Sequence, residues 1–280
     1  MSSALATVTR AEGRPPARPR LEIRTLRLDR FVVLGDDAIA ASVDQGAGAA
    51  DLLAARLGVQ AWNLAEEGAS SRSVLCEQLP LALALRPTFA VVSVGTPEAL
   101  AGLDAAATGC SAFLVPLLAD CEEIVVRLRA MACDVLLVRP PALDRSPAAW
   151  LRFGRHRPSS FARDFDAALR GMERVAARWS AALERIAAQH GALLADLSRV
   201  YDVQLRSGSL LDGAAPGLPP HCGGPGDLFA DPVRLSCDGA QVAAGLLEAA
   251  LHPGRRALQP AARGSRIVRT RFTSEKGIPC

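Results

Sequence analysis

Acidic side chains follow several short apolar runs of this sequence, at the points where the runs end. Asp36 and Asp37 follow FVVLG, Glu66 and Glu67 follow QAWNLA, and Glu98 comes shortly after TFAVVSVG. Carboxylates that gather in one place can hold Mg²⁺ or Ca²⁺, accept a phosphoryl group, or pair with an arginine. Which chemistry applies depends on the elements that position these side chains.

Apolar runs of strand length alternate with longer segments of helical periodicity along the chain. We expect strands at residues 31–35, 60–65, 88–95, 133–141 and 191–198. We expect helices at residues 47–57, 71–85 (interrupted by Pro80), 113–131, 161–191 and 237–252. Residues 206–230 are rich in Gly and Pro, which is typical of a loop. The alternation predicts right-handed crossovers and one parallel five-stranded sheet covered on both faces, an α/β three-layer domain.

The carboxyl ends of parallel strands meet at one edge of the sheet, where α/β proteins place their sites. The residues that this topology delivers to the edge are Asp36, Asp37, Glu66, Glu67, Glu98, Asp231 and Arg234. The sequence therefore predicts one rim with six carboxylates and one guanidinium.

Four of these segments, in this order, resemble the motif blocks of the SGNH (GDSL-type) hydrolases. They read VVLGDDAIAAS, NLAEEGAS, SVGTPEAL and DPVRLSCDG, and the similarity extends over about residues 31–252. The resemblance implies a flavodoxin-like sheet with strand order 2-1-3-4-5 and a site for esters or other acyl compounds.

The sequence departs from the family pattern at the catalytic positions. The serine nucleophile is replaced by Asp37, the oxyanion-binding Asn by Pro97, and the general-base His by Arg234. The family positions that remain are Gly68, whose backbone N–H would face the oxyanion, and Asp231, which would orient the base. Arg has a pKa above about 12 and cannot act as a base near neutral pH. We therefore expect Asp37, Arg234 and Asp231 to form a charge-paired group in place of the triad.

These departures predict a catalytically inactive pseudo-esterase that acts in ligand binding, scaffolding or regulation. Its partner would be a small acyl or ester ligand, or another protein. The alternative is an active esterase or acyltransferase with a relocated nucleophile and base. Residues that could serve in such a rebuilt site are His221, Ser70, Ser236 and Cys222.

Two other α/β families with acidic rims fit less well. Receiver domains need an Asp after the third strand and a Lys after the fifth, whereas Lys276 is the single lysine of the chain. Haloacid-dehalogenase-type phosphatases need Asp-x-Asp after the first strand, but Asp36 is followed by Asp37 and Ala38. Arg234 would oppose a metal cation at the rim, and no Gly-rich phosphate loop with Lys follows the first strand. We expect neither a metal nor a cofactor.

The net charge of +3 hides a basic arm at each end. Residues 1–28 are expected to form a disordered basic arm, 29–253 the folded domain, and 254–280 a basic tail. No motif for reading nucleic acid and no apolar run of membrane-spanning length is present in the sequence. The seven cysteines show no CxxC pair, and no secretory signal pattern opens the chain. These features favour a reduced, cytoplasmic protein.

Overall fold

The computed structural model describes residues 26–40, 47–102, 111–141, 165–200, 228 and 234–252. Their core is a five-stranded parallel sheet with the order β2-β1-β3-β4-β5. Its strands are β1 (Phe31–Gly35), β2 (Ala61–Asn63), β3 (Phe89–Ser93), β4 (Asp134–Arg139) and β5 (Leu193–Asp196). This is the architecture and strand order expected from the sequence.

Every residue of β1 and β3 is buried, as expected for central strands of a sheet covered on both faces. Pairing between them runs in register from Phe31 opposite Phe89 to Gly35 opposite Ser93. Both strands therefore end at the same level, which brings the residues after Gly35 beside those after Ser93.

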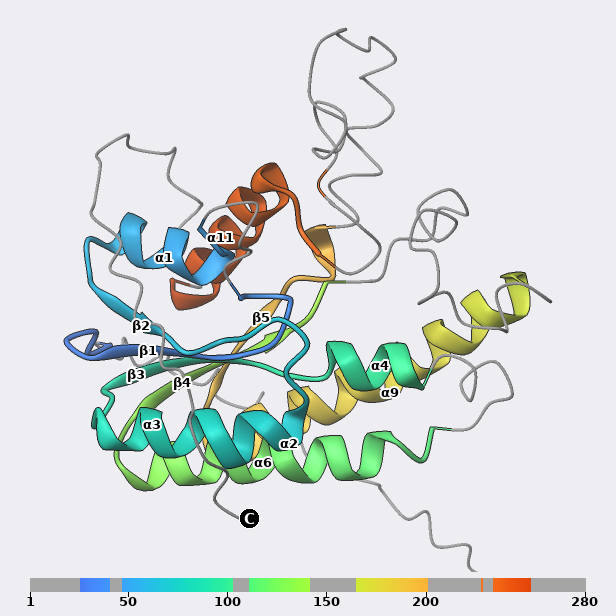
Figure 1. The fold of residues 1–280 in the computed structure, drawn as a ribbon, viewed down its shortest axis with the longest axis horizontal. Helices are drawn as coiled ribbons and strands as arrows, with labels where there is room; N and C mark the ends of the chain where they lie inside the picture. The colour runs from blue at the N-terminus through green and yellow to red at the C-terminus, as the bar shows by residue number, and fades with distance from the viewer. Residues whose placement is uncertain are drawn as a thin grey trace, which may run out of the picture.

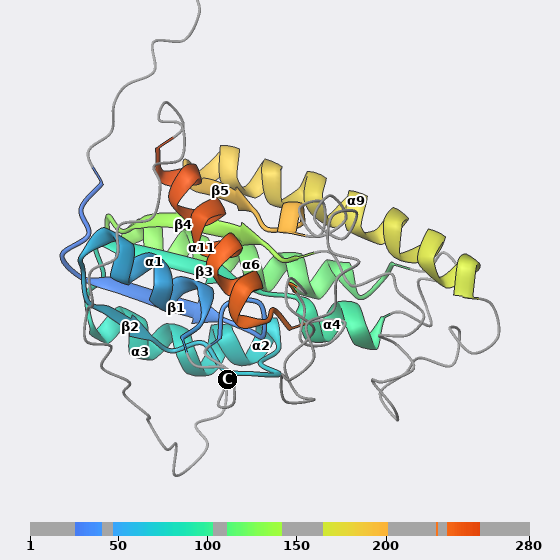
Figure 2. The same cartoon turned by 90° about the horizontal axis from the view of Figure 1, so that it is seen from above.

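Helices cover both faces of the sheet, and Figures 1 and 2 show the three layers. One face carries α1 (Ala49–Leu57) and α11 (Cys237–Leu251), which pack against each other. The other carries α2 (Ser71–Ser73), the π-helical turn η1 (Val74–Gln78), α3 (Leu79–Ala84), α6 (Leu114–Ala130) and α9 (Phe165–His190). A short helix, α4 (Thr96–Ala101), begins just beyond the end of β3.

The alternating side chains of the strands divide the core into two clusters, one on each face. On the α1 and α11 side, Phe31 and Phe89 meet edge to face with ring centroids 5.2 Å apart. On the other side, Val32, Leu34 and Val92 pack with residues of α6 and α9. Burial of these apolar faces against the sheet is the main stabilising contribution to such a domain.

The expected strands and long helices are present, with ends that differ by a few residues. α4 was not expected from the sequence, which predicts only that Thr96, Pro97 and Glu98 follow the third strand. Pro80 does not break the helical segment expected at 71–85. It lies in the first turn of α3, where the π-helical turn η1 ends, and proline fits the first turn of a helix. The predicted loop at 206–230 lies almost wholly outside the described residues, as do nearly all of both basic arms.

The cysteines differ in state among the described residues. Cys121 and Cys133 are buried free thiols, and Cys237 is exposed and forms no disulfide. Cys76 is disulfide-bonded, so the expectation of reduced cysteines does not hold at this position. Within the described part of the chain, no helix is long and apolar enough to cross a membrane.

Candidate active site

The turn after β1 is fixed by its surroundings rather than by its own sequence. Gly35 has a φ of 151°, and a Cβ atom there would lie 2.2 Å from the carbonyl oxygen of Ser93. The buried side chain of Gln78 both accepts the Gly35 N–H, at 2.8 Å, and donates to the Gly35 carbonyl, at 3.0 Å. Gly35 is therefore held close to Ser93 and bonded on both sides by the Gln78 amide. This fixes the position of the turn that carries Asp36 and Asp37.

Asp36 points into the protein and is completely buried. Its carboxylate accepts the backbone N–H of Thr96 at 2.7 Å and that of Ala38 at 3.3 Å, and the Ser93 hydroxyl lies 3.5 Å away. Burial raises the pKa of Asp36 to about 7, with a smaller contribution from the charge of Asp37, while the backbone hydrogen bonds oppose the shift. The buried carboxylate of Asp36 thus links the turn after β1 to the residues that follow β3.

Asp37 is the partly exposed member of the pair and lines a surface pocket. Partial burial raises its pKa, and the nearby charge of Glu67 acts in the same direction. Hydrogen bonds from the backbone N–H groups of Gly68 and of Asp37 itself lower the pKa, as does the charge of Arg234. The pKa of Asp37 therefore depends on the loop that carries Glu67 and Gly68 as well as on Arg234.

Arg234 precedes α11 and pairs with the loop that follows β2. Its Nη1 atom donates to Oε1 of Glu67 at 2.6 Å, and both side chains are partly exposed. The positive charge of this guanidinium also lowers the pKa of Asp37, so Arg234 interacts with two carboxyl groups, those of Glu67 and Asp37. We expected Arg234 to pair with Asp37. The close ion pair of Arg234 is with Glu67, and its charge also lowers the pKa of Asp37.

The pocket has an empty volume of about 460 Å³, part of it open to solvent. Among the residues that the structure describes, its charged lining consists of Asp37, Glu67 and Arg234, and small apolar side chains make most of the remaining wall. The remaining described residues that line it are Ala38, Ala40, Ala47, Gly48, Ala49, Leu235, Ser236, Cys237 and Ala240. Ser236 caps α11 by accepting the Gly239 N–H at 3.1 Å, which places Cys237 at the first turn of that helix.

The structure brings together Asp37, Gly68 and Arg234 from the residues expected at the site. Pro97 lies in the first turn of α4, directly after Thr96, and is not among the described pocket residues. Asp231 lies outside the described residues. The sequence reasoning missed Glu67 as the partner of Arg234, although Glu67 directly precedes Gly68 and was placed on the same rim.

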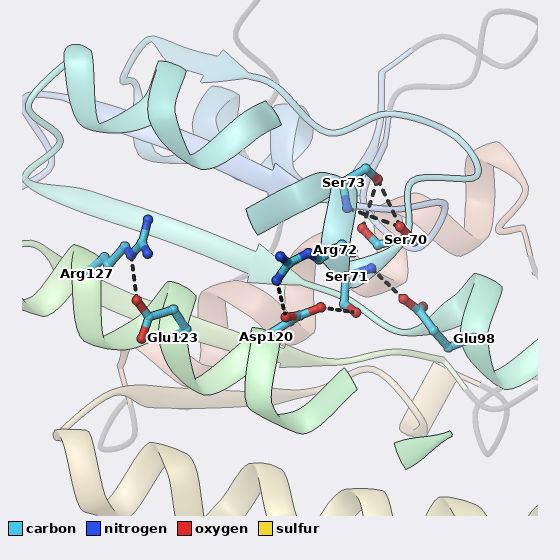
Figure 3. Close-up of polar contacts among 8 residues, drawn as sticks. All are labelled: Ser70, Ser71, Arg72, Ser73, Glu98, Asp120, Glu123 and Arg127. Atoms are coloured by element: carbon cyan, nitrogen blue, oxygen red, sulfur yellow. Dashed lines mark hydrogen bonds and ion pairs between the residues drawn. The ribbon is translucent and has the colours of Figure 1, made fainter. Parts of the chain in front are cut away.

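Ser70 follows the Gly68 loop and was one candidate for a relocated nucleophile. Its hydroxyl oxygen accepts the Ser73 N–H at 3.1 Å and lies 3.3 Å from the Ser73 hydroxyl, so Ser70 acts as a helix cap. Beside it, the backbone N–H of Ser71 donates to Glu98 at 2.5 Å and its hydroxyl lies 3.3 Å from Asp120 (Figure 3). These contacts tie the start of the 71–84 helical segment to α4 and α6.

The histidines of the described residues lie at the ends of helices. His190, the last residue of α9, is 2.9 Å from Glu122 of α6, and His252 directly follows α11. Neither lines the pocket among its described residues. No group of three or more His, Cys, Asp or Glu side chains in the described part of the chain is placed to hold a metal ion. The candidate base His221 lies outside it.

Comparison with known proteins gives one family and one fold. The sequence profile of the GDSL-like lipase/acylhydrolase family matches residues 33–254. A search of curated proteins gives no match. Among solved structures, the acetylxylan esterase Axe2 from Geobacillus stearothermophilus is similar, with 14% identity, a TM-score of 0.56, and coverage of 83% of this chain and 97% of Axe2. TesA is similar with 18% identity, a TM-score of 0.50, and coverage of 80% and 99% respectively.

Proposed function

The chain belongs to the GDSL-like lipase/acylhydrolase family, and we propose that it is a non-hydrolytic member whose former active-site pocket binds a small ligand. One observation carries this proposal: the pocket presents the carboxylate of Asp37 at the family's nucleophile position and the guanidinium of Arg234 at its base position, and the backbone N–H of Gly68, at the oxyanion position, lowers the pKa of Asp37. The donor that should receive a developing negative charge thus already acts on the carboxylate of Asp37.

The remaining positions support the same conclusion. Acyl transfer needs a nucleophilic oxygen, a base with a pKa near the working pH, and donors aimed at the oxyanion. Arg234 cannot take a proton near neutral pH, and Pro97 has neither a side-chain donor nor a backbone N–H. Loss of one oxyanion donor costs about 10²–10³ in rate, and loss of the nucleophile or base in a serine protease costs roughly 10⁶.

The charged pocket supports binding as the retained role. Asp37, Glu67 and Arg234 surround a hollow that small alanine side chains leave open. The ion pair of Arg234 with Glu67 holds two of these groups at the pocket. A family fold with such a pocket is suited to hold a ligand without converting it.

A relocated active site is the second candidate, because Ser236 and Cys237 line the same pocket. Ser236 accepts the Gly239 N–H as the cap of α11. Such a site would need a base such as His221 to approach Ser236 or Cys237.

The test is the initial rate of p-nitrophenyl acetate and butyrate hydrolysis by the purified protein and by an Asp37→Ala/Arg234→Ala variant. We expect both proteins to match the spontaneous rate. A Glu123→Ala/Arg127→Ala variant, which removes an exposed ion pair of α6, is the matched control for loss of two charges.

Hydrolysis above the spontaneous rate would overturn the proposal, and the variants would show why. If the activity is lost in the Asp37→Ala/Arg234→Ala variant alone, Asp37 is catalytic. If it survives there but is lost on Ser236→Ala or Cys237→Ala, the nucleophile has been relocated. Circular dichroism of each variant distinguishes loss of chemistry from loss of folding.

A further inference from the structure

The edge at which the five parallel strands begin, here the amino edge, lies opposite the pocket and carries two arginines held side by side. Arg30 directly precedes β1, and Arg86 lies in the turn between α3 and β3. Nε of Arg30 donates to the backbone carbonyl of Arg86, and the backbone N–H of Arg30 donates to the Thr88 hydroxyl at 3.0 Å. Both arginines are exposed. Two like charges are thus fixed next to each other at this edge.

Carboxylates of the described chain do not neutralise these charges. Within the described residues, neither Arg30 nor Arg86 forms an ion pair. The exposed Asp29 stands between two further exposed bases, Arg27 and Arg30. Asp134, at the start of β4, is already paired with Arg129 at 2.9 Å. The amino edge therefore presents a net positive charge.

Apolar side chains are exposed beside these arginines. The exposed large apolar residues of the described chain are Leu81, Val126, Met131 and Val115. All but Val115 lie in the last two turns of α3 and α6 or at the end of α6, which is the part of both helices nearest the amino edge. The turn of Met131 adjoins that of Arg86, because the backbone N–H of Asp134 donates to the carbonyl of Thr88 at 2.9 Å.

Both ends of the described chain lie at the amino edge. Residues 26–30 lead directly into β1. At the other end, α11 starts at the pocket and runs back until Glu248 pairs with Arg56 at 3.6 Å. Arg56 lies in the last turn of α1, just before the chain enters β2. His252 therefore lies at the amino edge as well, and Figure 2 shows the blue start of the described chain and the end of α11 on the same side.

The terminal segments of the sequence attach further positive charge to this edge. Residues 1–25 contain five Arg and two Glu, and residues 253–280 contain six Arg, one Lys and one Glu. Each segment is thus basic, although the net charge of the whole chain is only +3. The positive charge of the protein is therefore concentrated at the edge away from the pocket, and it complements an extended anionic surface.

We propose that the amino edge docks the protein on an anionic lipid membrane, with Arg30 and Arg86 at the head groups and Leu81 and Met131 in the interfacial layer. The guanidinium group binds phosphate and carboxylate oxygens through its fork of donors. Basic segments close to a membrane are attracted by its negative surface potential. Apolar side chains next to basic ones are typical of protein surfaces that lie in a membrane interface. This proposal is independent of the function of the pocket.

Nucleic acid is the other polyanion that this charge would attract, but the edge suits it less well. Single strands bind by stacking their bases on aromatic side chains, and duplexes bind elements that enter a groove. None of the exposed large apolar residues of the described chain is aromatic. Leu81 and Met131 gain nothing from a phosphate backbone, whereas the acyl region of a bilayer accepts them.

The test is co-sedimentation of the full chain with two kinds of vesicle, one of phosphatidylcholine alone and one of phosphatidylcholine mixed with phosphatidylserine. We expect the mixed vesicles to bind at least tenfold more tightly, and added salt to weaken this binding. Equal binding to both kinds of vesicle would overturn the proposal. Tighter binding of duplex DNA or single-stranded RNA in the same buffer, measured by fluorescence anisotropy, would replace the membrane by nucleic acid as the partner.

Charge variants make the assignment specific to the amino edge. Arg30→Gln/Arg86→Gln should weaken binding to the mixed vesicles at least fivefold. Arg72→Gln/Arg178→Gln is the matched control, because it removes two exposed arginines far from this edge, and it should bind like the wild type. Circular dichroism of each variant checks that it is folded. Equal affinities of the wild type and the Arg30→Gln/Arg86→Gln variant would show that the terminal segments bind without this edge, and would overturn the proposal.

Apolar variants test the second half of the contact. Leu81→Gln/Met131→Gln should weaken binding most at high salt, where the attraction between charges is screened. Val115→Gln is the control, since Val115 is exposed at the opposite end of α6. If the Leu81→Gln/Met131→Gln variant binds at high salt as tightly as the Val115→Gln variant, the two apolar side chains do not enter the membrane, and the proposed mode of docking is wrong.

Discussion

The carboxylate of Asp36 accepts the backbone N–H of Thr96 at 2.7 Å, which ties the turn after β1 to the start of α4. In this arrangement the first aspartate of the Gly-Asp-Asp sequence is structural and wholly buried, and the second lines the pocket. The position of Asp37 therefore depends on a neighbour that is itself sensitive to pH.

The first prediction concerns that pH dependence. Asp36 has a pKa of about 7 when folded, compared with 3.8 in its ordinary state. Between these values the unfolded chain releases a proton that the folded protein retains, so the contribution of Asp36 to the free energy of unfolding falls as pH rises from about 4 to about 7. At about 1.4 kcal/mol per pKa unit, the loss is roughly 4 kcal/mol.

Urea unfolding of the wild type and of an Asp36→Asn variant at several pH values between 5 and 8 checks this. The difference between the two proteins isolates Asp36 from other carboxyl groups, including Asp37. The variant should lose relatively less stability as the pH rises. Parallel stability curves for the two proteins would contradict the assignment.

The second prediction concerns the amide clamp on Gly35. Gln78→Leu introduces an apolar side chain of similar size and leaves both the N–H and the carbonyl of Gly35 without the amide that satisfies them. Each buried group left without a partner costs about 1–3 kcal/mol. Denaturant unfolding should show a loss of several kcal/mol. The same substitution at the exposed Gln241, whose partner is Arg56, is the control and should cost far less.

The third prediction concerns the close packing of Gly95 against α9. A Cβ atom at Gly95 would lie 2.2 Å from Cζ2 of Trp179, and the backbone φ is 112°. Gly95→Ala should therefore destabilise the protein by roughly 2–4 kcal/mol, from overpacking and a strained backbone together. Gly58→Ala separates the two effects, because Gly58 also has a positive φ, 69°, but its Cβ would meet nothing within 4 Å. Equal thermal stabilities of the two variants would refute the packing argument.

The fourth prediction concerns thiol reactivity. Burial raises the pKa of both Cys121 and Cys133 to about 12, so their reactive thiolate forms are scarce as well as inaccessible. Cys237 is exposed, forms no disulfide and lines the pocket. Brief treatment of the native protein with iodoacetamide, followed by peptide mass spectrometry, should label Cys237 well before Cys121 or Cys133. Labelling of Cys121 and Cys133 should require unfolding. Early labelling of either buried residue would contradict the packing described here.

Much of the fold could be predicted from the sequence because strand and helix periodicities are local properties. FVVLG and TFAVVSVG are apolar enough to be buried on both faces, and their alternation with helical segments implies parallel crossovers. The order of the four motif blocks placed Asp37, Gly68 and Arg234 at one edge of the sheet. The local pattern did not predict α4, because proline and glycine dominate its start.

What the sequence by itself determined was the set of groups available at the site and the chemistry that they lack: a carboxylate, a guanidinium and a proline stand where serine, histidine and asparagine would act. The tertiary structure decided how these groups are used. It buried Asp36, left Asp37 partly exposed at the pocket, and paired Arg234 with Glu67 across 167 positions of the chain. Such partners depend on side-chain reach and burial at the junction of distant segments, and neither quantity is encoded in the local spacing of residues.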